Sequence, residues 1–235
     1  MLLASLKMNR YQRQQQLPEI GAGGQKLLGA SRVVIVGCGA LGSVVAMYLA
    51  GAGVGEIVIA DFDTLDVSNL HRQVFYTEAD TGKPKVELLA DRMRRLNSDI
   101  TVVPVNEFIR PERLRQLAAQ GDVVIEAGDN PDTKYMVSDV CQSLDKPCVI
   151  GGVNGWQGQL LTCVSGGKYY RDVFAESAGA GFTPCSLAGV VGPLPGTIAS
   201  LQAIEAIKIL TRQPALKPQL LLFDALTMSF STIAL

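Results

Sequence analysis

Three glycines follow a β-branched apolar run in the stretch VVIVGCGALGS, residues 33–43. The spacing of Gly37, Gly39 and Gly42 is G-x-G-x-x-G, which is typical of a strand–turn–helix unit that binds phosphate. Gly37 permits the tight turn, Gly39 lets the backbone approach a phosphate, and Gly42 lets the helix pack closely on the strand. The helix N-terminus adds amide donors and partial positive charge. The motif predicts a phosphate-bearing ligand, and a glycine-rich turn without a ligand is the alternative.

The segment after the next predicted strand is crowded with functional side chains. Asp61 lies 19 residues after Gly42, at the usual place for a carboxylate that binds ribose hydroxyls. Asn69 and Arg72 are three residues apart, and an arginine offers a planar fork for phosphate. A dehydrogenase has no need of Asn, Arg and Gln clustered immediately after the ribose carboxylate. The cluster therefore argues against an NAD-dependent dehydrogenase.

Two more charged residues stand where a phosphate or a metal ion would explain them. Lys85 lies in the first turn of a predicted helix, where a cation is unfavourable unless an anion is near. Solvent exposure of Lys85 at a small cost is the alternative. Asp129 follows another buried strand and would lie with Asp61 at the carboxyl ends of the sheet. It is a natural Mg²⁺ ligand near a triphosphate, or else it caps the next helix.

Alternating strands and helices must position these residues. Apolar runs predict strands at 33–36, 56–61, 101–105, 122–127 and 147–151. Helical periodicity predicts helices at 41–52, 83–97, 111–119 and 131–144. This alternation predicts an α/β fold with a mostly parallel sheet and helices on both faces.

The pattern changes after Gly151, where an antiparallel C-terminal extension is expected. A strand is predicted at 157–164, an irregular Gly-rich stretch at 165–184, and a terminal hairpin at 219–223 and 227–234. A long apolar helix is predicted at about 196–211. Residues 185–204 are also uncharged, but Pro193 and Pro195 break this run, which favours a buried loop and a helix start over a membrane span.

The composition excludes several classes of protein. The 21 basic and 22 acidic residues leave no basic excess for a general nucleic-acid surface. Residues 33–55 are uncharged, but six glycines and a change from β-branched to Ala/Leu-rich composition favour a strand and a helix over a membrane span. Five scattered cysteines without a C-x-x-C pair, and no secretory leader, predict reduced thiols in a cytoplasmic protein. The expected core cysteines are Cys38, Cys141, Cys148 and Cys163.

Together the motifs resemble those of the ThiF/MoeB/HesA family, bacterial relatives of ubiquitin-activating enzymes. The matching pieces are RYQRQ (10–14), GCGALG (37–42), SNLHRQ (68–73), GKPK (82–85), GDN (128–130) and CSLAGVVGPLPG…LQAIEAIK (185–208). The resemblance runs from Arg10 to about Leu235 and implies a Rossmann-like sheet in a single adenylation domain, residues 1–235. Its expected parts are a helical arm (1–30), a nucleotide-binding half (31–151) and a carrier-binding antiparallel half (152–235).

The resemblance implies ATP-dependent adenylation of the C-terminal glycine of a small ubiquitin-fold sulfur-carrier protein, in thiamin or molybdopterin biosynthesis. It implies that Asp61 binds ribose and that Asp129 holds Mg²⁺. The implied phosphate ligands are Asn69, Arg72 and Lys85. Arg13 would reach the triphosphate of a neighbouring subunit, which makes a homodimer part of the active site. Other implied nucleotide contacts are Gly37, Gly39, Ala40, Gly42, Asp63, Ser68 and Asn130.

The chain departs from the family in three ways. Ala40 replaces a usual glycine of the loop, but its backbone N–H remains. Tyr169 and Asp172 occupy positions where many members have zinc-binding cysteines, and a structural zinc needs about four such ligands, so no zinc is expected. No rhodanese-like domain is apparent, so a separate sulfur donor protein is expected.

Other assignments stay open. Cys185 aligns with a family cysteine that can join the activated carrier in some members and is dispensable in others. Trp156 either packs against the carrier tail or fills the core, and the core is favoured. A peptide or another small acid is an alternative substrate, and a non-catalytic scaffold that binds a ubiquitin-fold partner is an alternative function.

Overall fold

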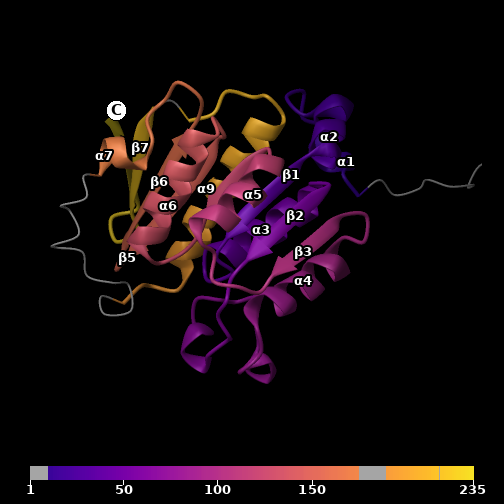
Figure 1. Ribbon diagram of the computed structural model, residues 1–235, viewed down its shortest axis with the longest axis vertical. Coiled ribbons are helices and arrows are strands. Elements are labelled where there is room, and N and C mark those ends of the chain that lie inside the picture. Colours follow the sequence, from indigo (N-terminus) through magenta and orange to yellow (C-terminus); the bar gives the residue numbers. More distant parts are fainter. Residues whose placement is uncertain (1–9, 175–188, 217) are drawn as a thin grey trace, which may run out of the picture.

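The computed structural model describes residues 10–174, 189–216 and 218–235. Its strands form one sheet in the order β3-β2-β1-β4-β5-β6-β7-β8 (Figure 1). The parallel strands are β1 (Arg32–Val36), β2 (Glu56–Ala60), β3 (Thr101–Val105), β4 (Val123–Glu126) and β5 (Cys148–Asn154). The antiparallel strands are β6 (Gln157–Cys163), β7 (Gln219–Asp224) and β8 (Ser229–Ala234). The predicted mostly parallel sheet with an antiparallel extension is confirmed.

Helices cover both faces of the parallel part. One face carries α3 (Gly42–Ala52), α4 (Lys85–Leu96) and α9 (Pro193–Leu210), and the other carries α5 (Pro111–Gln120) and α6 (Pro131–Ser143). Successive residues of β1 point to opposite faces, so Val33 packs with the first set of helices and Val34 with the second. Burial on both faces explains why these strands are continuous apolar runs. The four cysteines expected in the core, Cys38, Cys141, Cys148 and Cys163, are all fully buried.

Residues 10–30 pack at the end of α3 that is farther from the glycine loop. They contain α1 (Gln12–Gln15) and α2 (Gly21–Ala30). The side chain of Gln14 donates to the carbonyl of Ala52, 2.8 Å away, at the C-terminal end of α3. Figure 1 accordingly shows α1 and α2 at one end of the molecule and the loop that joins β2 to α4 at the other.

The structure corrects two predictions in the second half of the chain. The long helix α9 starts at Pro193 rather than at about 196, and Pro193 and Pro195 lie in its first turn, because the first amides of a helix have no intrahelical acceptor and their loss costs little there. A short helix, α7 (Tyr170–Val173), lies inside the stretch predicted to be irregular. Within the described ranges, no helix is both long enough and apolar enough to cross a membrane, and β1 and α3 account for the uncharged residues 33–55.

Candidate active site

The glycine loop joins β1 to α3 with no room for side chains at two of its glycines. Gly37 has φ +99°, and a Cβ there would lie 2.8 Å from the carbonyl oxygen of Ala127. A Cβ at Gly42 would lie 1.8 Å from the carbonyl oxygen of Gly37. A Cβ at Gly39 would meet only the amide of Gln73, at 3.5 Å. Gly37 and Gly42 therefore close the turn, and Gly39 leaves the backbone open to a ligand.

A cavity of about 900 Å³ opens beside this loop. It lies where β1 pairs with β2 on one side and β4 on the other, so the chain connections leave β1 in opposite directions. Open α/β sheets bind ligands at this point, at the carboxyl ends of the strands. Among the predicted nucleotide contacts, the cavity is lined by Gly37, Gly39, Ala40, Asp61, Asp63, Ser68, Asn69, Arg72, Lys85 and Asp129. The structure thus brings together residues spread over more than ninety positions of sequence.

Asp61 is held directly under the glycine loop. Its Oδ2 accepts the backbone N–H of Cys38 at 2.6 Å, and its Oδ1 accepts that of Asp63 at 2.9 Å. Burial raises the pKa of Asp61 above its usual value, while these two hydrogen bonds and the charge of Lys85 oppose the rise. The carboxylate is therefore fixed in orientation and faces the cavity with its remaining acceptor capacity.

Lys85 begins α4 and is buried, with 5 % of its surface exposed, so the alternative of a solvent-exposed lysine is wrong. Its Nζ donates to Asp63 Oδ2 at 2.9 Å, and its backbone N–H donates to the carbonyl of Asp63 at 3.0 Å. Asp63 is the anion that offsets the unfavourable position of a cation at a helix N-terminus. Because Nζ has three donors and one is used here, two remain for a ligand of the cavity that Lys85 lines.

The segment between β2 and α4 presents Asn69 at the end of a short helical turn, η1 (Val67–Asn69), and Arg72 in the turn that follows it. The side chain of Asn69 accepts the backbone N–H of Asp66 at 3.3 Å, and Arg72 donates to the carbonyl of Ser68 at 3.1 Å. The hydroxyl and the amide of Ser68 hydrogen-bond to Asp66 and lower the pKa of that carboxyl. The turn therefore places both side chains along one wall of the cavity.

Gln73 is a lining residue that the sequence reasoning did not single out. It is 4 % exposed, and its Oε1 has no hydrogen-bond partner within the described part of the chain. Its Nε2 lies beside Gly39, where a phosphate-bearing ligand is expected. An unpaired buried acceptor of this kind costs free energy in the fold. Its place in the SNLHRQ motif was the available sequence indication.

Asp129 and Asn130, which follow β4, have different roles. Asn130, rather than Asp129, caps α6: its Oδ1 accepts the backbone N–H of Asp132 at 2.9 Å. The alternative of Asp129 as the helix cap is therefore wrong. Asp129 is exposed and lines the cavity, whereas the side chain of Asn130 is engaged by the helix.

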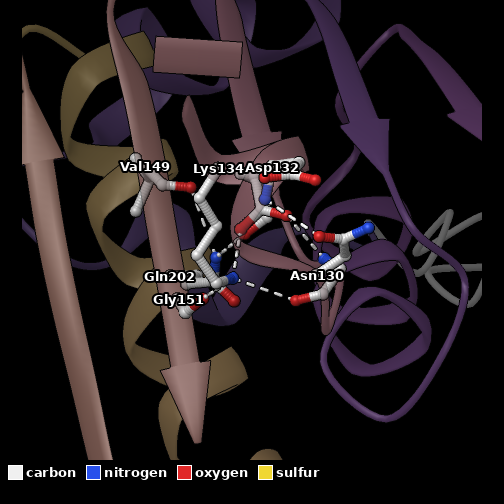
Figure 2. Close-up of polar contacts among 8 residues, drawn as sticks. Asn130, Asp132, Lys134, Val149, Gly151 and Gln202 are labelled. Atoms are coloured by element: carbon white, nitrogen blue, oxygen red, sulfur yellow. Dashed lines mark hydrogen bonds and ion pairs between the residues drawn. The ribbon is translucent and has the colours of Figure 1, made fainter. Parts of the chain in front are cut away.

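A buried ion pair behind Asp129 was also missed. Lys134 of α6 and Glu126 of β4 are joined by an Nζ–Oε2 contact of 2.5 Å, and burial raises the pKa of Glu126 against the opposing charge of Lys134. Figure 2 shows Lys134 reaching toward Gly151 on β5. A glutamate in the otherwise apolar strand VVIE was the sequence feature that could have indicated the pair.

The opposite wall of the cavity comes from the antiparallel part of the sheet. It includes Asn154 and Gln157 at the β5–β6 turn, Gln159 of β6 and Leu222 of β7. Trp156, at the same turn, is 48 % exposed, so its predicted place in the core is wrong. This wall offers amides and apolar surface for contact.

Three predicted residues or sites lie elsewhere. Arg13, in α1, does not line the cavity of its own chain. Cys185 lies outside the described residues. Tyr169 and Asp172, at the positions of the family's first cysteine pair, hydrogen-bond to each other: the backbone N–H of Tyr169 donates to Asp172 Oδ2 at 2.8 Å.

Comparison with known sequences identifies one family over nearly the whole chain. The sequence profile of the ThiF family matches residues 11–235. The chain is 41 % identical to the SAMP-activating enzyme E1 of Haloferax volcanii over 98 % of its own length and 86 % of the other protein. It is 42 % identical to the adenylyltransferase and sulfurtransferase MOCS3-1 of Zea mays and 41 % identical to MOCS3 of Bos taurus. The chain spans only about half of these two longer proteins, 49 % and 52 %.

Solved structures share the fold. The crystal structure of E. coli MccB with ATP has a TM-score of 0.81 at 25 % identity and covers 98 % of this chain and 72 % of its own. The microcin C7 biosynthetic enzyme MccB in complex with N-formylated MccA has a TM-score of 0.82, also at 25 % identity, over 96 % of this chain and 72 % of its own.

Proposed function

The chain belongs to the ThiF family and is an E1-like adenylyltransferase, and from that premise we propose that it adenylates a small ubiquitin-fold sulfur-carrier protein. ATP is the second substrate, the acceptor is the carrier's C-terminal glycine carboxylate, and pyrophosphate is released. The observation that carries the proposal is one cavity beside the glycine loop, lined by Asp61, Asn69, Arg72, Lys85 and Asp129. These groups match the parts of a nucleoside triphosphate: ribose hydroxyls, phosphates and a phosphate-bound cation.

The reaction requires an anion to attack an anion. A carboxylate oxygen of the carrier forms a bond to the α-phosphorus, and the bond from that phosphorus to the β-phosphate oxygen breaks. Two unit charges about 4 Å apart repel by roughly 4 kcal/mol at an effective dielectric near 20. Lys85 and Arg72, with the amides at the start of α3, offset this repulsion and the charge that develops on pyrophosphate. No proton has to be abstracted from the attacking carboxylate.

Asp129 is the proposed ligand for Mg²⁺. Its carboxylate is a hard oxygen donor and is exposed to the cavity, which suits a cation that takes one or two protein carboxylates together with phosphate oxygens. A bound Mg²⁺ would neutralise charge on the phosphates. The chain's own contribution is to hold the Asp129 carboxylate in the cavity lining, three residues after the end of β4.

The remaining parts of the proposal concern assembly. Arg13 does not reach its own cavity, which supports its delivery by the second subunit of a homodimer. The uncharged wall formed by β5, β6 and β7 suits an extended Gly-Gly tail bound largely through hydrogen bonds. We place the reaction in the cytoplasm, in thiamin or molybdopterin biosynthesis, with a separate sulfur donor protein and without a zinc ion.

The test is carrier-dependent exchange of labelled pyrophosphate into ATP. The protein is incubated with ATP, Mg²⁺ and each plausible ubiquitin-fold carrier that ends in Gly-Gly, and a carrier without its last glycine is the control. Exchange is expected with one intact carrier and not with the shortened form. Exchange with none of the carriers would overturn the enzymatic proposal.

One observation favours a second substrate class. The matched MccB structures include complexes with ATP and with MccA, so in that protein the same fold binds MccA as well as ATP. The second candidate is adenylation of a peptide or another small acid. Mass spectrometry of the adenylated product separates the two, because the modified species is either the intact carrier or a smaller molecule.

A further inference from the structure

Lys134 lines the cavity but has no donor left for a ligand. Its ammonium has three N–H groups. They point to Glu126 Oε2 at 2.5 Å, to the carbonyl oxygen of Gly128 at 2.9 Å and to that of Gly151 at 2.6 Å. Figure 2 shows the side chain extended between the start of α6 and the backbone of β5. A cationic side chain at the wall of a phosphate site is thus committed entirely to the protein.

Gly128, the residue immediately before Asp129, is held from both sides of its backbone. Its carbonyl accepts from Lys134, and its N–H donates to Glu126 Oε1 at 2.9 Å. A Cβ on Gly128 would lie 2.9 Å from that same carboxylate oxygen. The ion pair therefore acts as a clamp that sets the direction in which the chain leaves β4 and presents Asp129.

The third contact of Lys134 joins the two regions of the site. Gly151 is the residue of β5 at which the strand passes beyond the end of β4, and the following residues Gly152, Val153 and Asn154 line the cavity wall opposite the phosphate ligands. One ammonium group thus connects the segment of Asp129 with the strand that begins the uncharged wall.

Fold stability alone does not account for this pair. Lys134 lies in the first turn of α6, where the helix dipole disfavours a cation. Both side chains are buried, at 6 % and 0 % exposure, and an apolar pair of similar volume is commonly as stable as a buried ion pair. What an apolar pair cannot do is hold the amide and the carbonyl of one loop residue.

We propose that Lys134, with Glu126 as its counter-ion, is a positioning residue. It fixes the Gly128 backbone so that Asp129 faces the cationic phosphate ligands Arg72 and Lys85, and it keeps the uncharged wall in register with these ligands. The proposal rests on the proposed function only for the identity of the ligand at Asp129. It makes Lys134 neither a phosphate ligand nor a catalytic residue, since it touches no reacting atom.

The variant E126L/K134M tests this proposal. It removes both charges together, because K134M alone would leave a buried carboxylate unpaired and could prevent folding. Hydrogen exchange of the intact chain without ligand is expected to quicken about tenfold or more at residues 127–130 and to stay unchanged in β1 and β2. Calorimetric binding of ATP with Mg²⁺ and with EDTA is expected to show that the gain in affinity from Mg²⁺ falls about tenfold, with binding in EDTA unaltered.

Q202M is the matched control. Gln202 of α9 is fully buried and donates to the carbonyls of Glu126 and Val149, at 2.7 and 3.3 Å, from the opposite face of the same strands. The variant removes comparable buried hydrogen bonds without touching Gly128. It is expected to lower the melting temperature and to leave both the exchange at 127–130 and the Mg²⁺ gain unchanged. The same changes in Q202M as in E126L/K134M would show a merely structural role and overturn the proposal.

Pyrophosphate exchange supplies a separate readout. With saturating carrier, kcat of E126L/K134M is expected to fall about a hundredfold while KM for ATP stays within about threefold, because the phosphate ligands on the β2 side are untouched. If wild-type protein exchanges with no carrier but the hydrogen-exchange and Mg²⁺ results hold, the proposed function fails and the positioning role stands. Unchanged hydrogen exchange at 127–130 in the double variant overturns the positioning role alone.

Discussion

The two regions of the sheet meet at one cavity but line it with opposite kinds of side chain. Every charged residue found in the lining, within the described ranges, comes from the parallel region: Asp61, Asp63, Asp66, Arg72, Lys85, Asp129 and Lys134. The lining from the antiparallel region consists of amides, glycines and apolar side chains, including Gln157, Gln159 and Leu222.

The physical reason lies in how each region exposes its strand ends. Parallel strands all end at the same edge, so the loops after β1, β2 and β4 converge and their polar residues gather there. The antiparallel strands run past that edge and present a sheet face, where alternate side chains point toward the cavity. The parallel region is therefore suited to binding a polyanion, and the antiparallel region is suited to binding an extended, uncharged chain. Three substitutions test this division, and a fourth tests an ion pair outside the cavity lining.

The largest effect is expected at Lys85. K85M removes a buried cation from the charged region and is expected to lower kcat/KM for pyrophosphate exchange about 10²–10³-fold, by analogy with the loss of one preorganised donor. Asp63, its partner, has a side chain about half exposed and tolerates the loss. K83M is the control, since the side chain of Lys83 is exposed and its Nζ donates to the carbonyl of Ala79, away from the cavity lining. Equal losses in the two variants would show that general charge, rather than the position of Lys85, matters.

The next largest effect is expected at Arg13, a cation that the second subunit of a homodimer would supply to the charged region. R13A is expected to lower exchange about a hundredfold. A mixture of R13A and K85M should recover about a quarter of wild-type activity, because half of the randomly formed dimers are mixed and each mixed dimer has one intact site. Recovery is measured after subunit exchange. If the mixture is no more active than its components, Arg13 either acts in the active site of its own chain or has no part in the active site.

A smaller effect is expected in the uncharged region. Q157E adds a negative charge next to the path of an anionic tail and is expected to raise KM for the carrier about tenfold through charge repulsion, with KM for ATP unchanged. T232E is matched to it: Thr232 of β8 is exposed and belongs to the opposite face of the same sheet. An equal rise in KM for the carrier in T232E, or a rise in KM for ATP in Q157E, would break the proposed division of the two walls.

The smallest effect is expected on the free energy of unfolding, at Asp80, which pairs with Arg92 of α4. Burial favours protonation of Asp80, but hydrogen bonds from Thr77 and the charge of Arg92 outweigh it and hold the pKa of Asp80 below its usual value. Since the folded-state pKa is depressed, this stabilisation is present above the unfolded value of about 3.9 and is lost as the pH falls through the folded value. D80N is expected to lower the free energy of unfolding by about 1 kcal/mol at pH 7, with a smaller difference at pH 3 and normal exchange activity. Urea titrations at the two pH values measure this, and an equal loss at both would contradict it.

The fold was predictable where local pattern and packing agree. The apolar runs that became β1, β2 and β4 are buried on both faces, so their composition alone distinguishes them from loops. The start of α9 was missed because a proline in the first turn of a helix looks like one that prevents it, and only the surrounding contacts separate the two cases. Trp156 was misplaced because its size favours burial, while the turn that carries it lies at the surface.

By itself, the sequence determined the glycine loop, the strand ends and the residue types that follow them, because each depends on spacing within a short segment. Tertiary structure alone decided how those segments are used. It showed Asn130 as the cap of α6 with Asp129 left to the cavity, paired Lys85 with Asp63, and committed Lys134 to Glu126, Gly128 and Gly151. Such partners are distant along the chain or compete with equally suitable neighbours. Which of them meet depends on where the strands end relative to one another, and no local pattern records that.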